Sequence, residues 1–218
     1  MNIFVETISP DEIGRAAATG FADGVVFSDA AYAGAQSPEG RDLLASVATD
    51  FGIPMCVEVE AISGADMYRE ARELARISDH IIVQLPLVED AIAPMHKLSL
   101  EGIRVGATFV FNGAQAVLAA KAGASMVRIS LHDLDTQGRT SADAVTEIRS
   151  LLEASDCECD VMVASPATAA QFTECISAGA QIVSIRPQIL HSLLLHPLTD
   201  RGVDRFLSGV ARRPRMRD

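Results

Sequence analysis

The sequence predicts an α/β protein, a single-domain (β/α)8 barrel of the TIM type. Its 218 residues suit one domain, and 49% of them are hydrophobic, enough for a sizeable core. Short, almost wholly apolar β-rich runs alternate with helical stretches, about 25 residues apart, as parallel strands buried on both faces do. Eight such units favour a closed barrel, because an open sheet of eight strands would leave two edges exposed.

Four strand–helix units are expected in the first half of the chain. The strands are predicted at 3–6, 24–27, 54–59 and 79–86. The helices are predicted to start at Ser9 and to span 39–50, 63–77 and 88–101. Ser9 and Pro10 are a suitable N-cap and first helical residue, and Gly102 is a suitable residue just past a helix end.

The second half repeats this rhythm. Strands are expected at 104–109, 125–130, 160–165 and 181–185, and helices at 114–122, 142–154, 167–178 and around 189–195. A polar loop is expected after the sixth strand, a C-terminal helix at about 199–210, and a short basic tail at 211–218. We find no linker or domain boundary, so residues 1–218 are predicted to form one domain.

Composition excludes several functional classes. The net charge of -11 disfavours nucleic acid as a main partner. The N-terminus lacks the features of a signal peptide, and no apolar run is long enough to span a membrane. The four cysteines show no paired metal-ligand spacing, so we expect reduced thiols, no metal site and a cytoplasmic protein.

Polar residues gather where the predicted strands end, which is where (β/α)8 barrels carry their chemistry. The candidates are Glu6, Ser28, Glu58, Gln84, Thr108, Asn112, Arg128, Ser130, His132, Asp133, Ser165 and Arg186. Glu58 is expected to point inward, where a dry environment suits a carboxyl that carries protons, and Glu60 lies on the same side of an extended strand. Each arginine could hold an anion, or could instead pair with an outer helix. No nucleotide, zinc-protease or serine-hydrolase motif is present, and no cofactor is expected.

Several segments carry a family resemblance over nearly the whole chain. Residues 3–7 (IFVET) are similar to I-F-L-D-T, 81–86 (IIVQLP) to I-V-V-K-I/V-P, and 114–124 to A-Q-A-L-L-A-A-K-A-G-A. Residues 101–103 with Thr108, and 196–200 (HPLTD), also match in order and spacing. The chain thus resembles the transaldolase/fructose-6-phosphate aldolase family, in its small transaldolase-like subfamily. That resemblance implies a class I aldolase-like barrel in carbohydrate metabolism and a homo-oligomer, a pentamer or decamer.

The resemblance also implies roles for single residues. The family's Schiff-base lysine corresponds to Gln84, which cannot form an imine, and the chain has only two lysines, Lys97 and Lys121. Glu58 and Thr108 match the acid and the threonine that hold the family's catalytic water, and Glu6 replaces its proton-handling aspartate. Other positions differ as well: the substrate-contacting turn now contains Ser28, Asp133 replaces an arginine, and Ser165 alone remains of a phosphate-binding Ser-x-Arg/Lys.

Three functions follow from these substitutions. The first is an enzyme without imine chemistry, in which Glu6, Glu58, Gln84 and Thr108 carry out acid–base or water-dependent chemistry on a sugar or sugar phosphate. Isomerisation and hydrolysis both fit that description. The second is a non-catalytic sugar-phosphate-binding or structural descendant, and the third is residual carbon–carbon bond chemistry.

Overall fold

The strands expected from the sequence are present, and they close into a barrel. The computed structural model describes residues 1–27, 38–136, 138 and 140–211. Within these residues the strands are β1 (Asn2–Glu6), β2 (Gly24–Phe27), β3 (Met55–Glu58), β4 (Ile81–Pro86), β5 (Val105–Thr108), β6 (Met126–Ser130), β7 (Asp160–Ala164) and β8 (Ile182–Ile185). Each strand pairs in parallel with its neighbours in chain order, and β8 pairs with β1, so the predicted (β/α)8 fold is confirmed.

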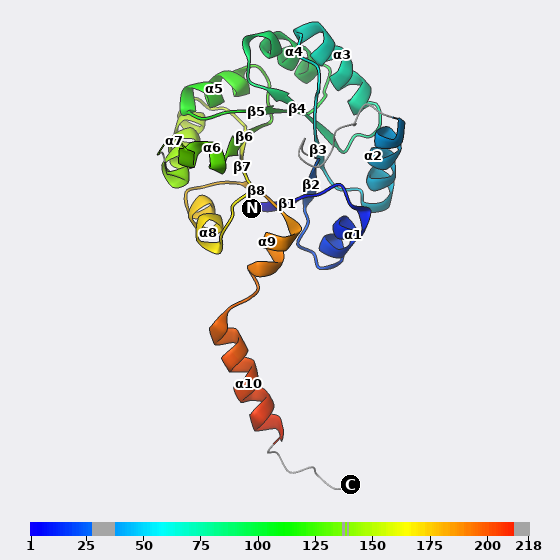
Figure 1. The fold of residues 1–218 in the computed structure, drawn as a ribbon. Helices are drawn as coiled ribbons and strands as arrows, with labels where there is room; N and C mark the ends of the chain where they lie inside the picture. The colour runs from blue at the N-terminus through cyan, green and yellow to red at the C-terminus, as the bar shows by residue number, and fades with distance from the viewer. Residues whose placement is uncertain (28–37, 137, 139, 212–218) are drawn as a thin grey trace.

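Helices surround the barrel as an outer ring (Figure 1). The helices within the described residues are α1 (Pro10–Ala18), α2 (Pro38–Phe51), α3 (Gly64–Ala75), α4 (Glu89–Leu100), α5 (Gly113–Lys121), α6 (Leu131–Thr136), α7 (Ser141–Ala154), α8 (Ala169–Ser177), α9 (Pro187–Ser192) and α10 (Pro197–Ala211). Apart from α6, which we expected to be a loop, each lies where the sequence predicted a helix.

Polar caps fix where several outer helices begin. The side chains of Ser63, Asn112, Thr140 and Thr168 each accept a hydrogen bond from the backbone N–H three residues further on. Ser9 precedes α1 as predicted and Pro10 opens the helix, but the Ser9 side chain makes no capping bond. At the other end of α4, Gly102 adopts a φ of +77°, which favours glycine and ends the helix.

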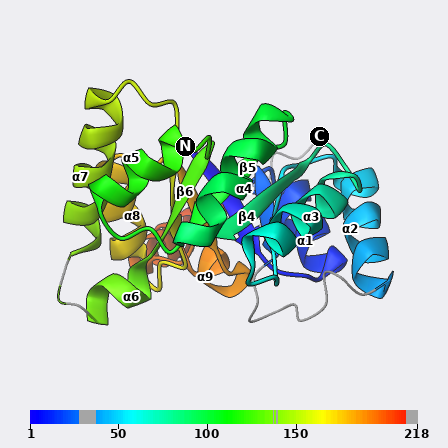
Figure 2. The ribbon, with the colours of Figure 1, turned by 90° about the horizontal axis from the view of Figure 1, so that it is seen from above.

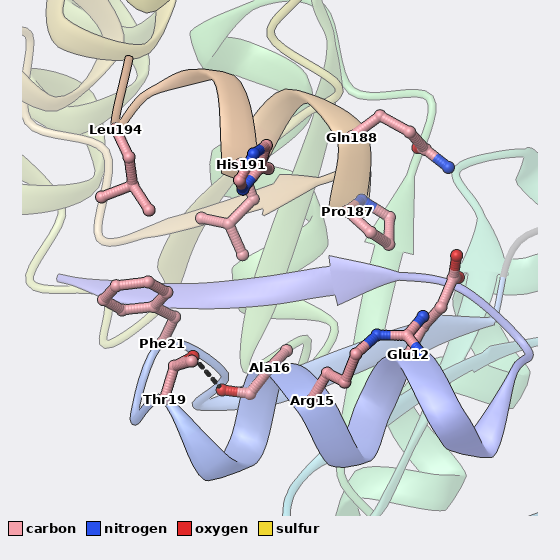
Figure 3. Close-up of a pocket in the computed structure, with 10 residues that line it drawn as sticks. Glu12, Arg15, Ala16, Thr19, Phe21, Pro187, Gln188, His191 and Leu194 are labelled. Carbon is pink, nitrogen blue, oxygen red and sulfur yellow. Dashed lines mark hydrogen bonds between the residues drawn. The ribbon is translucent and has the colours of Figure 1, made fainter. Parts of the chain in front are cut away.

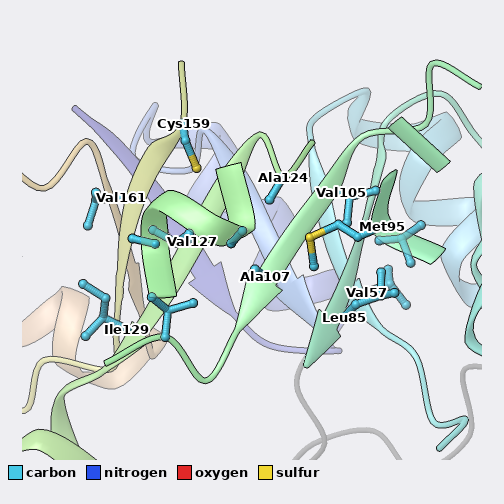
Figure 4. Close-up of a cluster of buried hydrophobic side chains, with 14 of the residues drawn as sticks. Val57, Leu85, Met95, Val105, Ala107, Ala124, Val127, Ile129, Cys159 and Val161 are labelled. Atoms are coloured by element: carbon cyan, nitrogen blue, oxygen red, sulfur yellow. The ribbon is translucent and has the colours of Figure 1, made fainter. Parts of the chain in front are cut away.

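The larger part of the core lies between the strands and the outer helices. Alternate strand residues such as Val57, Leu85, Val105 and Ile129 point outward and are fully or almost fully buried (Figure 4). Met95 of α4 packs into the same layer. Because the strands are buried on both faces, they read in the sequence as the continuous apolar runs that predicted a parallel sheet.

A second, smaller apolar cluster fills the inside of the barrel. The side chains that form it are Phe4, Val26, Cys56, Ile82, Met126, Met162 and Ile182, one from each strand except β5. The residue that β5 contributes at this level is Gly106, where a Cβ atom would meet Met126 Cγ at 2.9 Å. The barrel interior is therefore closed by packed side chains, and we call these seven residues the inner apolar layer.

The segment after β6 differs from the sequence-based prediction. Polar composition favoured a loop, but Leu131–Thr136 forms the short helix α6, in which Leu131 and Leu134 are buried. Burial of these two leucines, three residues apart, stabilises a helical turn that the polar neighbours alone did not indicate. Figure 2 shows α6 and α9 at the same end of the barrel.

The C-terminal helix α10 leads away from the barrel (Figure 1). Its apolar residues Leu198, Val203, Phe206, Leu207 and Val210 are between 46% and 67% exposed. The basic tail ends outside the described residues, which stop at Ala211.

Candidate active site

Polar residues form a layer directly above the inner apolar layer, at the end of the barrel where the strands finish. Each follows an inward-facing residue by two positions, as strand alternation requires. The members of this polar layer are Glu6, Glu58, Gln84, Thr108, Arg128 and Ser184, contributed by β1, β3, β4, β5, β6 and β8. The sequence-based expectation that Glu58 points inward therefore agrees with the structure.

The centre of the polar layer is an ion pair between Arg128 and Glu58. Arg128 Nη1 donates to Glu58 Oε1, and it lies 3.4 Å from Gln84 Oε1. The two charged side chains are only 14% and 19% exposed, so the pair is largely removed from water. We had left open whether Arg128 would pair with an outer helix; it reaches across the barrel interior instead. The guanidinium stabilises the charged form of the Glu58 carboxylate next to it.

Gln84 lies beneath this pair and is 1% exposed. Its Oε1 faces Arg128, while its Nε2 lies 3.9 Å from Met126 Sδ and the side chain also contacts the Cys56 thiol. Gly106 on the neighbouring strand leaves room for Met126, because a Cβ there would lie 2.9 Å from Met126 Cγ. Gln84 therefore supports Arg128 from below.

A second carboxylate, Glu6, is held by two serines. Ser184 donates to Glu6 Oε1 over 2.6 Å, and Ser165 lies 2.8 and 2.6 Å from the two carboxylate oxygens. Ser184 is completely buried, whereas Ser165 is exposed at the end of β7. Ser165 has a φ of +56°, uncommon outside glycine, and this conformation accompanies the hydrogen bonds of its hydroxyl to Glu6.

The same backbone conformation recurs after β5. Phe109 follows the buried Thr108 and has a φ of +58°. Its side chain is 57% exposed, which places a large aromatic ring in solvent at the carboxyl end of the barrel. The hydroxyl of Thr108 makes no hydrogen bond to any residue that the structure describes.

The remaining sequence-predicted candidates are more dispersed. Asn112 caps α5 by accepting a bond from Gln115 N at 2.9 Å, so its side-chain oxygen has a structural role. Ser130 is half-buried at the end of β6, and His132 and Asp133 follow on α6 rather than on the expected loop. Arg186 is exposed at the N-cap of α9. Ser28 lies outside the described residues, and Glu60 lies beyond β3, where it is exposed and its backbone N–H donates to Glu70.

Both lysines are on the outside of the barrel. Lys97 is in the last turn of α4, with Nζ 5.8 Å from the ring centre of Tyr68 on α3. Lys121 is exposed at the end of α5. Neither side chain is near Gln84, so no lysine amine enters the polar layer.

A thiol lies just below the polar layer. Cys56 Sγ is 3.9 Å from Met126 Sδ, and burial raises the pKa of Cys56 from 9.0 to about 12, although Arg128 nearby opposes this shift. A thiol with such a pKa stays protonated at neutral pH and is a poor nucleophile.

A separate groove of about 510 Å³ lies between α1 and α9 (Figure 3). Phe21, Pro187 and Leu194 line its apolar part, and Glu12, Arg15 and His191 its polar part. It contains no member of the polar layer. Among the described residues no cluster of three or more metal-ligating side chains occurs, and no helix is long and apolar enough to cross a membrane.

This protein is an eight-stranded parallel barrel with carboxylates and a guanidinium in its interior, near the carboxyl ends of the strands. It therefore belongs to the class of (β/α)8 barrels whose site lies at the strand ends. Comparison with known sequences narrows this class. Residues 34–213 match the family model described as transaldolase/fructose-6-phosphate aldolase. The chain belongs to this family of carbohydrate metabolism.

Relatives match over almost their whole length. A probable transaldolase of Phenylobacterium zucineum is 33% identical over 215 residues, covering 97% of both chains. One from Thermodesulfovibrio yellowstonii is 34% identical over 207 residues, covering 95% of this chain and 96% of the relative. One from Methanococcus maripaludis is 33% identical over 211 residues, with the same coverage of each.

Proposed function

We propose that this protein is a transaldolase-like enzyme that moves protons next to the carbonyl of a sugar or sugar phosphate without forming an imine. The observation that carries the proposal is the ion pair of Arg128 and Glu58 over Gln84 at the barrel centre. An imine needs an amine there, and both lysines lie on outer helices.

Arg128 supplies the positive charge that proton removal next to a carbonyl requires. When a base takes a proton from that carbon, the electron pair of the C–H bond forms a C=C bond and negative charge collects on the carbonyl oxygen. A guanidinium fixed in a largely dry site stabilises this oxyanion without reorganising. Only Nη1 of Arg128 has partners among the described residues, so Nε and Nη2 can donate to the oxyanion.

Glu58 is the proposed base. It is ion-paired and partly accessible, with 19% of its side chain exposed, so a carboxylate oxygen can reach a substrate. Return of the proton to the adjacent carbon, with transfer of the hydroxyl proton to the first oxygen, interconverts an aldose and a ketose. Gln84, at 1% exposure, is then a positioning residue that holds Arg128. Glu6 and the Thr108 hydroxyl border the same space.

Deuterium exchange tests this reaction directly. The protein is incubated in D2O with ketoses and ketose phosphates, fructose and fructose 6-phosphate among them, and NMR follows deuterium entry beside the carbonyl. We expect exchange by the native protein and a loss of about 100-fold or more in Glu58→Gln. Glu60→Gln, which changes an exposed carboxyl just beyond β3, serves as the matched control and should keep full activity.

Two outcomes would contradict the proposal. If sugars bind but no proton exchanges, the protein is a non-catalytic binder. If borohydride with fructose 6-phosphate traps a covalent adduct by mass spectrometry, imine chemistry persists and our interpretation of Gln84 is wrong. We expect Gln84→Lys to gain no aldolase activity, because the Arg128 guanidinium lies 3.4 Å from the Gln84 amide oxygen and would repel a second cation.

We also propose a homo-oligomer, the pentamer or decamer that the family resemblance implies, in which α10 packs on a neighbouring copy. An isolated helix of 15 residues is marginal in water, and the apolar residues of α10 are exposed. Light scattering coupled to size exclusion should give a mass several times that of one chain. Phe206→Asp should lower that mass and the control Arg201→Gln should not; a monomeric native protein would refute the proposal.

A further inference from the structure

We infer that the site takes an uncharged sugar or polyol in preference to its phosphate ester. This inference deepens the proposed function by naming its substrate class, and it rests on that function only for the location of the site. The evidence for this inference is the set of charged side chains at the carboxyl end of the barrel and the hydrogen bonds and ion pairs that they make.

On the side of the barrel formed by β7, β8 and β1, the half-buried charged group is the carboxylate of Glu6, whereas Arg186, which follows β8, is exposed. Barrels of this type commonly bind a phosphate on the loops after their seventh and eighth strands. Here the Glu6 carboxylate lies beside those strand ends, bonded to Ser165 of the β7 loop and Ser184 of β8. The hydroxyl of Ser165 is thus directed to a carboxylate, and a phosphate dianion placed there would be repelled by Glu6.

The cations at this end do not outweigh the acids. Arg128 is already neutralised by Glu58. Arg186 is the other arginine that the described strand ends contribute, and it is exposed to solvent. The half-buried Asp133 on α6 adds further negative charge. Among the residues that the structure does not describe, 28–37 contain no lysine or arginine, whereas residue 139 is an arginine.

The groups that are present suit neutral hydroxyls. Carboxylates accept hydrogen bonds from hydroxyl groups, and such charge-assisted bonds are stronger than neutral ones. Glu6 and Glu58 are both half-buried in the polar layer, so each can bind a sugar hydroxyl without competing fully with water.

Phe109 points to the same class of ligand. Its φ of +58° nearly equals the +56° of Ser165, and each residue directly follows the last residue of a barrel strand. The Ser165 hydroxyl reaches Glu6 over the barrel interior. The Phe109 ring is 57% exposed just after β5, where it can offer an apolar face to the C–H groups of a sugar.

Matched pairs of ligands test the inference by binding alone. Isothermal titration and thermal shift compare fructose with fructose 6-phosphate, and dihydroxyacetone with dihydroxyacetone phosphate. In each pair we expect the neutral member to bind at least about 10-fold more tightly, which corresponds to about 1.4 kcal/mol. Inorganic phosphate at millimolar concentration should not compete.

Charge variants separate repulsion from general damage to the site. Glu6→Gln removes the negative charge but keeps an acceptor for the two serines, so it should improve binding of the phosphorylated member relative to the neutral one by about 10-fold. Glu60→Gln should leave that ratio unchanged. Phe109→Ala should weaken binding of the neutral member and leave the melting temperature of the free protein within about 2 °C, because an exposed side chain stabilises the fold little.

The inference is overturned if the phosphorylated members bind more tightly than the neutral ones, or if no neutral sugar binds. An unchanged ratio in Glu6→Gln also contradicts it. These results differ from failure of the proposed function. If neutral sugars bind tightly but no deuterium exchanges, the proposed reaction is refuted and the proposed substrate class stands. If only phosphorylated ketoses exchange deuterium, the proposed reaction stands and the proposed substrate class is refuted.

Discussion

Removing the Arg128 side chain should lower the free energy of unfolding by more than the loss of its packing contacts alone would. The added cost arises because the Glu58 carboxylate would be left in the barrel without its cation. The perturbation is Arg128→Met, which keeps much of the side-chain volume. Breaking a buried ion pair by removing one partner costs about 3–5 kcal/mol. Since the two side chains keep 14% and 19% exposure, water relieves part of this cost, and we expect about 2–4 kcal/mol.

The double variant separates the interaction energy between Arg128 and Glu58 from the other effects of each substitution. Glu58→Gln alone should also destabilise, because it leaves the Arg128 guanidinium without a counter-charge. Arg128→Met with Glu58→Gln should cost less than the sum of the two single variants, by a coupling energy of about 1–3 kcal/mol. The sign arises because the second substitution removes the charge that the first left unpaired.

Urea unfolding, followed by circular dichroism, provides the assay. The matched control is the same cycle on Arg149 and Glu153, an ion pair on α7 with 23% and 67% exposure, which should couple by about 0.3–0.5 kcal/mol. If the Arg128–Glu58 coupling is no larger than that of the control, the pair is not held in a desolvated centre. The proposed role of Arg128 in stabilising an oxyanion would then lose its physical basis.

Three further changes test other parts of the site by urea unfolding. Gly106→Ala should cost about 1–3 kcal/mol, since the new methyl lies 2.9 Å from Met126 Cγ; an unchanged stability would show that this side chain moves aside freely. Ser184→Ala should cost about 1–3 kcal/mol by removing a buried donor to Glu6, and a neutral result would contradict the importance of that bond. Cys56→Ala should destabilise less at pH 10.5 than at pH 8. Burial raises the pKa of the folded thiol from 9.0 to about 12, so the stability that it contributes falls as pH rises between those values, by about 1.4 kcal/mol per unit. An equal effect at both pH values would refute the raised pKa.

The element boundaries could largely be predicted because local signals coincide with tertiary burial. The run from Ile81 to Pro86 is apolar on both faces of a strand, and Gly102 ends the helix after it with a positive φ. The segment after β6 was mispredicted because its helix depends on burial of Leu131 and Leu134 against the rest of the fold. That contact is not visible in a polar local composition.

The members of the site were easier to predict than their partners. The strand pattern predicted that Glu58 points inward, but it left open whether Arg128 does. It could not show that they bond to each other, because 70 residues separate them and only closure of the barrel brings them together. Ser184 was missed, although it alternates with Ile182 on β8 and could have been found by the same rule that indicated Glu58.

The sequence by itself determined the barrel, its order of strands and the identity of most polar side chains at the strand ends, because apolar runs, strand alternation and helix caps are local properties of the chain. Only the tertiary structure decided which charges neutralise each other. Arg128 joins Glu58 above Gln84, and Glu6 joins the serines of two other strands, because a closed barrel turns alternate residues of distant segments toward one axis. Those pairings determine which ligand charge the site can accept.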